Sequence, residues 1–251
     1  QVKLKPGRIH SANADCVHVN GGIFGPWIEN SLFEGYSDDA INMKSARANI
    51  LDQKSPTQLI VKYEVKKGDV IRIFNPREGV LVGKYEIVEN KFLGEGKMLI
   101  TLNSPINQKL NVGYDKKNHI AYGITINNGV DWGEGFVSHN IKINQNIFNN
   151  CGYDDTYLKE YDAAAIRMRV TKLKDLESKT KWNGVATSDW QGLENITITN
   201  NTFSYNKLAL SIECSVNTII KGNTFIRNSK DLSKESDVIL QNNNTNLIFE
   251  K

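Results

Sequence analysis

The chain has 251 residues, and its 31 lysines and arginines nearly balance its 28 aspartates and glutamates, giving a formal net charge of +3. This small charge, spread without a basic stripe, argues against a nucleic-acid partner, and no apolar run is long enough to cross a membrane as a helix. The three cysteines, Cys16, Cys151 and Cys214, are far apart and lack metal-ligand spacing. They favour buried free thiols over a disulfide, and we expect neither a cofactor nor a metal.

An aspartate and an aspartate doublet in the first part of the chain are separated by 23 to 24 residues. Asp15 lies in Asn13-Ala14-Asp15-Cys16-Val17-His18, and the doublet Asp38-Asp39 precedes Ala40-Ile41-Asn42, so the separations are 38 − 15 = 23 and 39 − 15 = 24. If the chain coils with turns of that length, the acidic residues fall on adjacent strands, which lie about 4.7–4.9 Å apart. Carboxyl groups at such spacing suit acid and base work on one glycosidic bond.

The doublet contains two unequal candidates. Successive strand residues point to opposite faces, so at most one of Asp38 and Asp39 follows a regular strand into a groove. With Val17 and Ile41 inward, His18 and Asn42 project outward on neighbouring turns. His18 either binds a sugar hydroxyl or caps a turn, and the pattern leaves Asp38 and Asp39 both open.

Residues 46–118 interrupt this pattern with hairpin-like pieces. The stretches 58–63 and 70–74 alternate apolar and polar residues around Lys67-Gly68-Asp69, and 80–88 and 98–102 follow, with Gly94-Glu95-Gly96 between them. Short alternating strands joined by glycine-containing turns predict a small antiparallel β-barrel-like module. We expect it to be inserted between β-helix turns at 1–45 and at 119–251.

The second half of the chain carries an internal repeat. Ile141 to Phe148 is echoed by Ile196 to Phe203, by Ile219 to Phe225, and more weakly by Asn246 to Phe249; the phenylalanines of the last three are 22 and 24 residues apart. Each copy has alternating β-branched residues, then a polar asparagine, then a large apolar residue. Repeats that cannot bury their apolar faces alone stack into a solenoid. The pattern predicts an all-β, right-handed parallel β-helix, with an antiparallel sandwich as the alternative.

A charged stretch near 153–191 breaks the repeat and predicts a long loop at the rim of a site. Within it, Arg167 and Arg169 share a strand face after Ala163-Ala164-Ala165. Arg167 either holds substrate or forms a structural salt bridge.

The runs around Asp15, Ile28 to Phe33 and Asp38 to Asn42 together resemble glycoside hydrolase family 110. The inserted module, from Lys67-Gly68-Asp69-Val70-Ile71 to Arg77-Glu78, and the run Asp131-Trp132-Gly133-Glu134-Gly135 are similar to that family as well. The resemblance implies a β-helical exo-α-1,3-galactosidase that inverts the anomeric centre, with Asp15, Asp38 and Asp39 as its catalytic acidic group. Trp132 and Glu134 are predicted to be site residues only because of this resemblance.

We therefore expect a secreted or periplasmic glycosidase that removes terminal α-linked galactose from a glycan, with paired aspartates as acid and base. The predicted substrate-binding residues are His18, Asn42, Lys44, Trp132, Glu134 and Arg167. Two alternatives share the scaffold. One is a polygalacturonase-type hydrolase or a polysaccharide lyase, although the Gly-His-Gly and Arg-x-Lys motifs of polygalacturonases are absent from the chain. The other is a non-catalytic glycan-binding β-helix.

Overall fold

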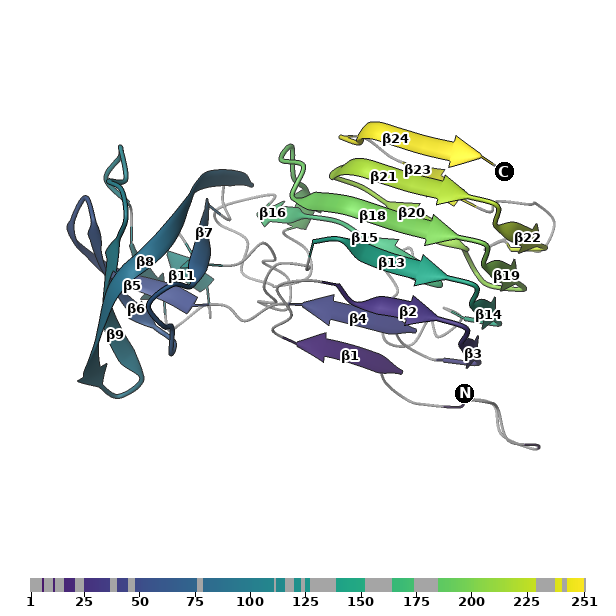
Figure 1. Cartoon of the computed structure of the whole chain (residues 1–251), viewed down its shortest axis with the longest axis horizontal. Helices are drawn as coiled ribbons and strands as arrows, with labels where there is room; N and C mark the ends of the chain where they lie inside the picture. The colour runs from purple at the N-terminus through teal and green to yellow at the C-terminus, as the bar shows by residue number, and fades with distance from the viewer. Residues whose placement is uncertain are drawn as a thin grey trace. The chain divides into compact units, whose positions relative to one another are not determined.

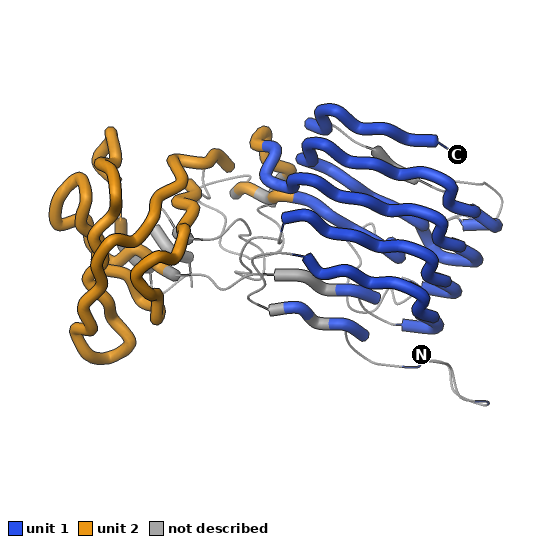
Figure 2. Tube along the Cα trace, viewed as in Figure 1, with its two compact units in different colours: residues 1–45, 137–169, 191–251 blue, residues 46–136, 170–190 orange. Residues whose placement is uncertain are grey.

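The computed structural model describes residues 6, 11, 16–20, 25–36, 40–44, 48–75, 79–110, 112–115, 120–122, 125–126, 139–151, 164–173, 185–228, 238–240 and 243–250. The chain divides into two compact units, which Figure 2 distinguishes by colour. Unit 1 comprises Gln1–Ser45, Val137–Arg169 and Gln191–Lys251, and unit 2 comprises Ala46–Phe136 and Val170–Trp190. The described residues form strands and no helix, which confirms the all-β prediction. Accordingly, none of them belongs to a helix that could span a membrane.

Unit 1 is built from parallel strands, and each turn of the chain contributes strands at up to three successive positions (Figure 1). We call these positions the first, second and third places. The first place holds β2 (Trp27–Glu29), β13 (Ile141–Asn144), β18 (Leu193–Thr199), β21 (Ser215–Lys221) and β24 (Thr245–Glu250). The second holds β3 (Leu32–Glu34), β14 (Ile147–Asn149), β19 (Thr202–Ser204) and β22 (Thr224–Ile226). The third is formed by two separate sheets: the pair β1 (Val17–Asn20) and β4 (Ile41–Lys44), and the trio β15 (Ile166–Met168), β20 (Leu210–Ile212) and β23 (Val238–Leu240). All described strand pairs of this unit are parallel, against the antiparallel sandwich alternative.

Chain order assigns these strands to successive turns. Strands β2, β3 and β4 form one turn, β13, β14 and β15 the next, and β18 to β20 and β21 to β23 the following two. Strand β2 pairs with β13, and β3 pairs with β14. The turn that ends in β4 therefore lies against the turn that ends in β15, although the inserted module separates them in sequence.

The core of unit 1 contains a column of phenylalanine rings. Phe33, Phe148 and Phe203 are buried, and the ring centroids from Phe33 to Phe148, Phe148 to Phe203 and Phe203 to Phe225 are 4.9, 5.0 and 5.4 Å apart, with planes within 10° of parallel. Stacking at these distances adds to the free energy of burying the rings. The repeat from Phe203 to Phe225 is confirmed at 22 residues.

A ladder of buried asparagines fixes the corner between the first and second places. The Asn146 backbone amide donates to Asn201 Oδ1 at 2.9 Å, and the Asn201 amide donates to Asn223 Oδ1 at 2.9 Å. At the earlier turn, the Ser31 amide donates to Asn146 Oδ1. Each side chain thus satisfies a backbone group of its neighbour, which accounts for the asparagine seen in each repeat.

The prediction that Phe249 repeats Phe225 is wrong. Phe249 lies in β24, which pairs with β21 so that Phe249 stands opposite Ile220, 29 residues earlier. It belongs to the first place with Ile198 and Ile143 rather than to the phenylalanine column. The Phe225 and Phe249 rings are correspondingly tilted by 52° at 6.4 Å. A large apolar residue suits an inward position of either strand, so spacing alone mistook one for the other.

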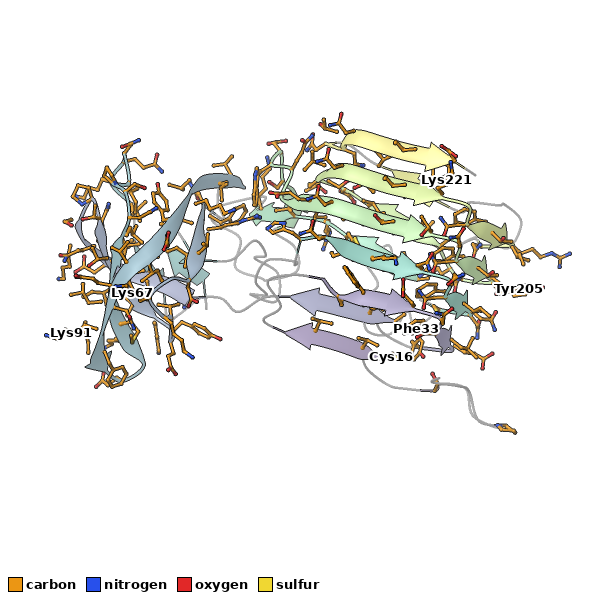
Figure 3. The ribbon with its side chains drawn as sticks, viewed as in Figure 1. Cys16, Phe33, Lys67, Lys91, Tyr205 and Lys221 are labelled. Atoms are coloured by element: carbon orange, nitrogen blue, oxygen red, sulfur yellow. The ribbon has the colours of Figure 1, made fainter. Side chains whose placement is uncertain are left out.

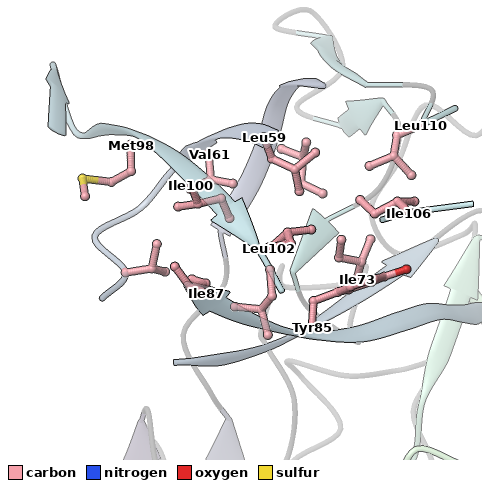
Figure 4. Close-up of a cluster of buried hydrophobic side chains, with 13 residues drawn as sticks. Leu59, Val61, Ile73, Tyr85, Ile87, Met98, Ile100, Leu102, Ile106 and Leu110 are labelled. Atoms are coloured by element: carbon pink, nitrogen blue, oxygen red, sulfur yellow. The ribbon is translucent and has the colours of Figure 1, made fainter. Parts of the chain in front are cut away.

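Unit 2 contains a closed barrel with the strand order β12-β5-β6-β9-β8-β7. Its strands are β5 (Ala48–Ser55), β6 (Gln58–Lys62), β7 (Val70–Asn75), β8 (Val80–Gly94), β9 (Lys97–Leu102) and β12 (Thr125–Ile126), which lies beyond the predicted end at 118. The described pairs within it are antiparallel. Alternating residues of these strands, among them Leu59, Ile73, Ile87 and Ile100, fill its interior (Figure 4). Two further hairpins, β10 (Gly113–Asp115) with β11 (Ile120–Tyr122) and β16 (Thr171–Leu173) with β17 (Val185–Thr187), complete the unit.

The segment predicted as a long loop near 153–191 is partly regular. Its described residues include β15 of unit 1 and the hairpin β16–β17 of unit 2. Strand β15 forms because Ile166 and Met168 are buried on either side of the half-buried Arg167.

Candidate functional site

Strands β1 and β4 carry the register on which the predicted site depends. Val17 pairs with Ile41, so neighbouring residues differ by 41 − 17 = 24 in number. The Val17 amide donates to the Ala40 carbonyl at 3.2 Å and fixes this register. His18 stands opposite Asn42, and Asn20 opposite Lys44. The structure thus brings three predicted binding positions onto two paired strands, while the side chains of His18, Asn42 and Lys44 lie outside the described part.

The remaining predicted residues are known only from their positions in sequence. Asp15 precedes β1 by two residues, and the Asp38-Asp39 doublet ends two residues before β4. Asp15, Asp38, Asp39, Trp132 and Glu134 all lie outside the described residues. The β1–β4 step of 24 equals the sequence separation of Asp15 and Asp39.

The same backbone pattern recurs at the third place of the later turns. The Ile166 amide donates to the Ala209 carbonyl at 3.1 Å, just as Val17 donates to Ala40. Ile166 pairs with Leu210 and Arg167 with Ser211 in the β15–β20 pair. Ile166 and Met168 are buried, so Arg167, which alternates with them, lies on the opposite face of β15.

A second arginine and a glutamate extend this face. The Glu213 amide donates to the Met168 carbonyl at 2.9 Å, which places Glu213 beside Arg169 on the neighbouring turn. Glu213 is only 7% exposed, and Arg167 and Arg169 are half-buried. Glu213 is not among the predicted site residues. The sequence feature that marks it is an acidic residue directly after the buried strand Leu210–Ile212.

Two groups with raised pKa values lie near Cys16, the residue that directly precedes β1. Burial, followed by a hydrogen bond with the Cys16 thiol, raises the pKa of the Tyr36 phenol above its ordinary value, while a backbone hydrogen bond at Glu34 opposes the rise. Burial raises the pKa of the Cys151 thiol to about 12. Cys16, Cys151 and Cys214 are all free, in agreement with the predicted thiols. Burial therefore favours the neutral forms of the Tyr36 phenol and the Cys151 thiol, which we call the uncharged layer. Figure 3 labels Cys16 and Phe33 in this part of unit 1.

The residues that stand two positions before the later strands of this set are apolar. Ala164 precedes β15 and Leu208 precedes β20 by two residues, and both are buried. In sequence, Asp15 and Asp39 stand two residues before β1 and β4. Among the described residues, no group of three or more histidines, cysteines or acidic residues is arranged to hold a metal ion.

Comparison with known proteins gives two similarities. Alpha-1,3-galactosidase A of Bacteroides thetaiotaomicron is 25% identical over 197 residues, which cover 58% of this chain and 35% of that protein. Alpha-1,3-galactosidase B of Akkermansia muciniphila is 27% identical over 125 residues, which cover 45% of this chain and 15% of that protein. The match thus spans about a third or less of the length of either relative, and no protein-family model matches the chain. The two similarities confirm a relationship of this chain to α-1,3-galactosidases of the glycoside hydrolase family 110 type.

Proposed function

We propose that this chain is a glycoside hydrolase that removes terminal α-linked galactose from a glycan with inversion, on a right-handed parallel β-helix. The observation that carries the proposal is the β1–β4 register, whose step of 24 residues equals the separation of Asp15 and Asp39. The names of the two relatives supply the sugar and the linkage. Parallel strands that return once per turn support the β-helix, and parallel crossovers are right-handed in about 98% of cases.

The register sets the spacing of the proposed acid and base. We extend the β1–β4 register by two residues, to Asp15 and Asp39. Backbones of adjacent strands are about 4.8 Å apart, so in this proposed arrangement Asp39 lies opposite Asp15 at about that separation. Asp38 is offset by one further residue, which gives about 5.8 Å between backbones. Side chains that splay outward from such a pair reach the separation of about 6.5–9.5 Å at which a water molecule fits between two carboxyl groups for inversion.

We propose that Asp15, which precedes Cys16 in sequence, is the general acid. A carboxyl group placed beside a buried phenol and a buried thiol would lose hydration, which favours its protonated form. One member of the doublet then acts as the base that activates water, and the other orients that water or a sugar hydroxyl. Two adjacent carboxylates also raise one another's pKa, so the proposal requires only one of them to be ionised.

Substrate would lie along the outer face of the third place. His18 pairs with Asn42, and Lys44 lies two residues further along β4. We place Arg167, on β15 of the next turn, in the row of His18 and Asn42, and Arg169 in the row of Lys44. Two residues span about 6.6 Å along a strand, close to the length of one sugar unit, so these rows suit the galactose and the next sugar. The resemblance to glycoside hydrolase family 110 implies that Trp132 and Glu134 supply further contacts with the substrate.

The proposal is tested by turnover of an α-1,3-linked galactobiose. Asp15→Asn, Asp38→Asn and Asp39→Asn are each expected to lower kcat, by about 10²–10⁴-fold where the carboxyl group transfers a proton. Asp52→Asn is the control, because Asp52 is an exposed barrel carboxylate paired with Lys54, and its turnover should equal that of the unaltered chain. Full turnover by Asp15→Asn, or no release of galactose by the unaltered chain, would contradict the proposal.

A further inference from the structure

Unit 2 has a pocket of its own at one end of the barrel. Its volume is about 290 Å³, and it is lined by Glu64, Val65, Lys66, Asn90, Phe92, Gly96 and Met98. This volume is close to the lower limit of about 300 Å³ for small-molecule sites, which occur often in the mouths of β-barrels. All seven residues belong to unit 2, so the pocket is independent of the strands that carry the proposed catalytic residues.

Strand register explains why an aromatic ring lies at this mouth. Phe92 stands opposite Met98, and Asn90 opposite Ile100, in the β8–β9 pair. Residues directly opposite one another project from the same face of a sheet, and Met98 and Ile100 point into the barrel core. Phe92 therefore continues the inward-facing row, but it lies past the core, and its side chain is 65% exposed.

Polar groups surround the ring on the other sides. Asn90 Nδ2 donates to the Val65 carbonyl at 3.1 Å, which fixes the amide at the pocket wall and leaves its oxygen as an acceptor. Glu64 and Lys66, on either side of Val65, are exposed and provide a carboxylate acceptor and an ammonium donor. The pocket thus combines one aromatic face, an apolar floor at Val65 and Met98, and a few polar groups around the edge.

We propose that the mouth of this barrel binds a neutral pyranose unit of a glycan. The apolar C–H face of the sugar packs on Phe92, and its hydroxyl groups bond to Glu64, Lys66 and Asn90. A neutral sugar fits better than a charged ligand, because Glu64 and Lys66 balance each other's charge. The site goes beyond the proposed hydrolase site, and only the choice of galactose as the first probe rests on that proposal. Such a module would hold the chain on its glycan between cleavage events.

The test is a protein-observed NMR titration of the full chain with the methyl β-glycosides of galactose, glucose and mannose, which lack the α-galactosidic bond that the proposed hydrolase cleaves. At least one sugar is expected to shift the Val65, Gly96 and Met98 amides, with a dissociation constant on the order of 1 mM. Phe92→Ala should weaken this binding about tenfold or more, because it removes the stacking face. Leu93→Ala is the matched control: Leu93 is also exposed, but it is not among the residues that line the pocket, so this change should leave binding unchanged.

The outcomes separate this inference from the proposed function. No shift of the three amides with any of the sugars, or equal binding by Phe92→Ala and the unaltered chain, would overturn the barrel site. A shift abolished by Phe92→Ala supports it even if the chain releases no galactose from any galactoside, in which case only the proposed hydrolase fails. Conversely, galactose release together with unshifted barrel amides would leave the hydrolase standing and remove the barrel site.

Discussion

Asn201→Ala is expected to be among the most destabilising single changes in unit 1. Asn201 is buried in the ladder. Its Oδ1 accepts the backbone amide of Asn146 at 2.9 Å, and its Nδ2 donates to the Ile143 carbonyl at 3.0 Å and to Asn223 Oδ1 at 3.0 Å. An alanine side chain reaches none of these groups. The change therefore removes partners from a backbone donor and a backbone acceptor at once.

The magnitude follows from the two backbone groups. A buried donor or acceptor left without a partner costs about 1–3 kcal/mol, so two of them cost about 2–6 kcal/mol of unfolding free energy. In a chain of this size, 1 kcal/mol shifts the melting temperature by about 2–4 °C. Asn201→Ala should therefore lower Tm by roughly 10 °C in differential scanning calorimetry.

Asn144→Ala provides the control. Asn144 Oδ1 accepts from Thr199 Oγ1 at 2.9 Å and from Asn200 Nδ2 at 3.1 Å, and its Nδ2 donates to Gln145 Oε1 at 3.2 Å, so this alanine removes three side-chain hydrogen bonds. These groups are partly exposed, and water can replace the lost partner, so the expected loss is below about 1 kcal/mol. Equal losses in the two variants, or an unchanged Tm for Asn201→Ala, would refute the argument that burial of the ladder decides its contribution.

Three further changes test the core and the uncharged layer. Gly83→Ala places a methyl group 2.5 Å from the Tyr85 hydroxyl oxygen and should cost about 1–3 kcal/mol in urea unfolding; wild-type stability would show that the ring moves freely. Phe203→Leu breaks the middle of the ring column and should cost about 1–2 kcal/mol in the same assay, whereas no loss would mean that the stacked geometry contributes little. The Cys151 pKa of about 12, against an ordinary 9.0, means that the folded chain holds a proton that the unfolded chain releases between these values. Stability should therefore be full below about pH 9 and fall by up to about 1.4 kcal/mol per pH unit above it, and Cys151→Ala should lessen that slope in pH-dependent urea unfolding; an unchanged slope would contradict the buried neutral thiol.

The repeats of unit 1 could be predicted because each position in them has one dominant physical requirement. Isoleucines alternate because one strand face is buried, asparagine recurs because a corner needs a side chain that bonds backbone groups, and phenylalanine recurs because rings stack. Phe249 was misplaced because its position was inferred from spacing after Phe225, while 29 residues separate it from its true partner Ile220. The length of the connection between turns varies, and the alternation within the strands does not predict that length.

The candidate site could be predicted only in part. The step between Asp15 and Asp39 predicted two neighbouring strands, and β1 and β4 pair with that step. The turn that carries Arg167 lies against the turn of β4 because β2 pairs with β13 across the whole inserted module, a contact between residues far apart in the chain that no local pattern contains. The barrel pocket was missed for a similar reason, since Phe92 and Val65 come together only when the barrel closes.

The stereochemistry of the first sugar released tests the central claim most directly. Proton NMR of the unaltered chain acting on an α-1,3-linked galactobiose would follow the anomeric signal of free galactose before mutarotation. The account predicts that the β anomer appears first, because water attacks between Asp15 and one member of the Asp38-Asp39 doublet on adjacent strands. Initial release of the α anomer would mean retention, and it would contradict the proposed spacing and roles of these carboxyl groups.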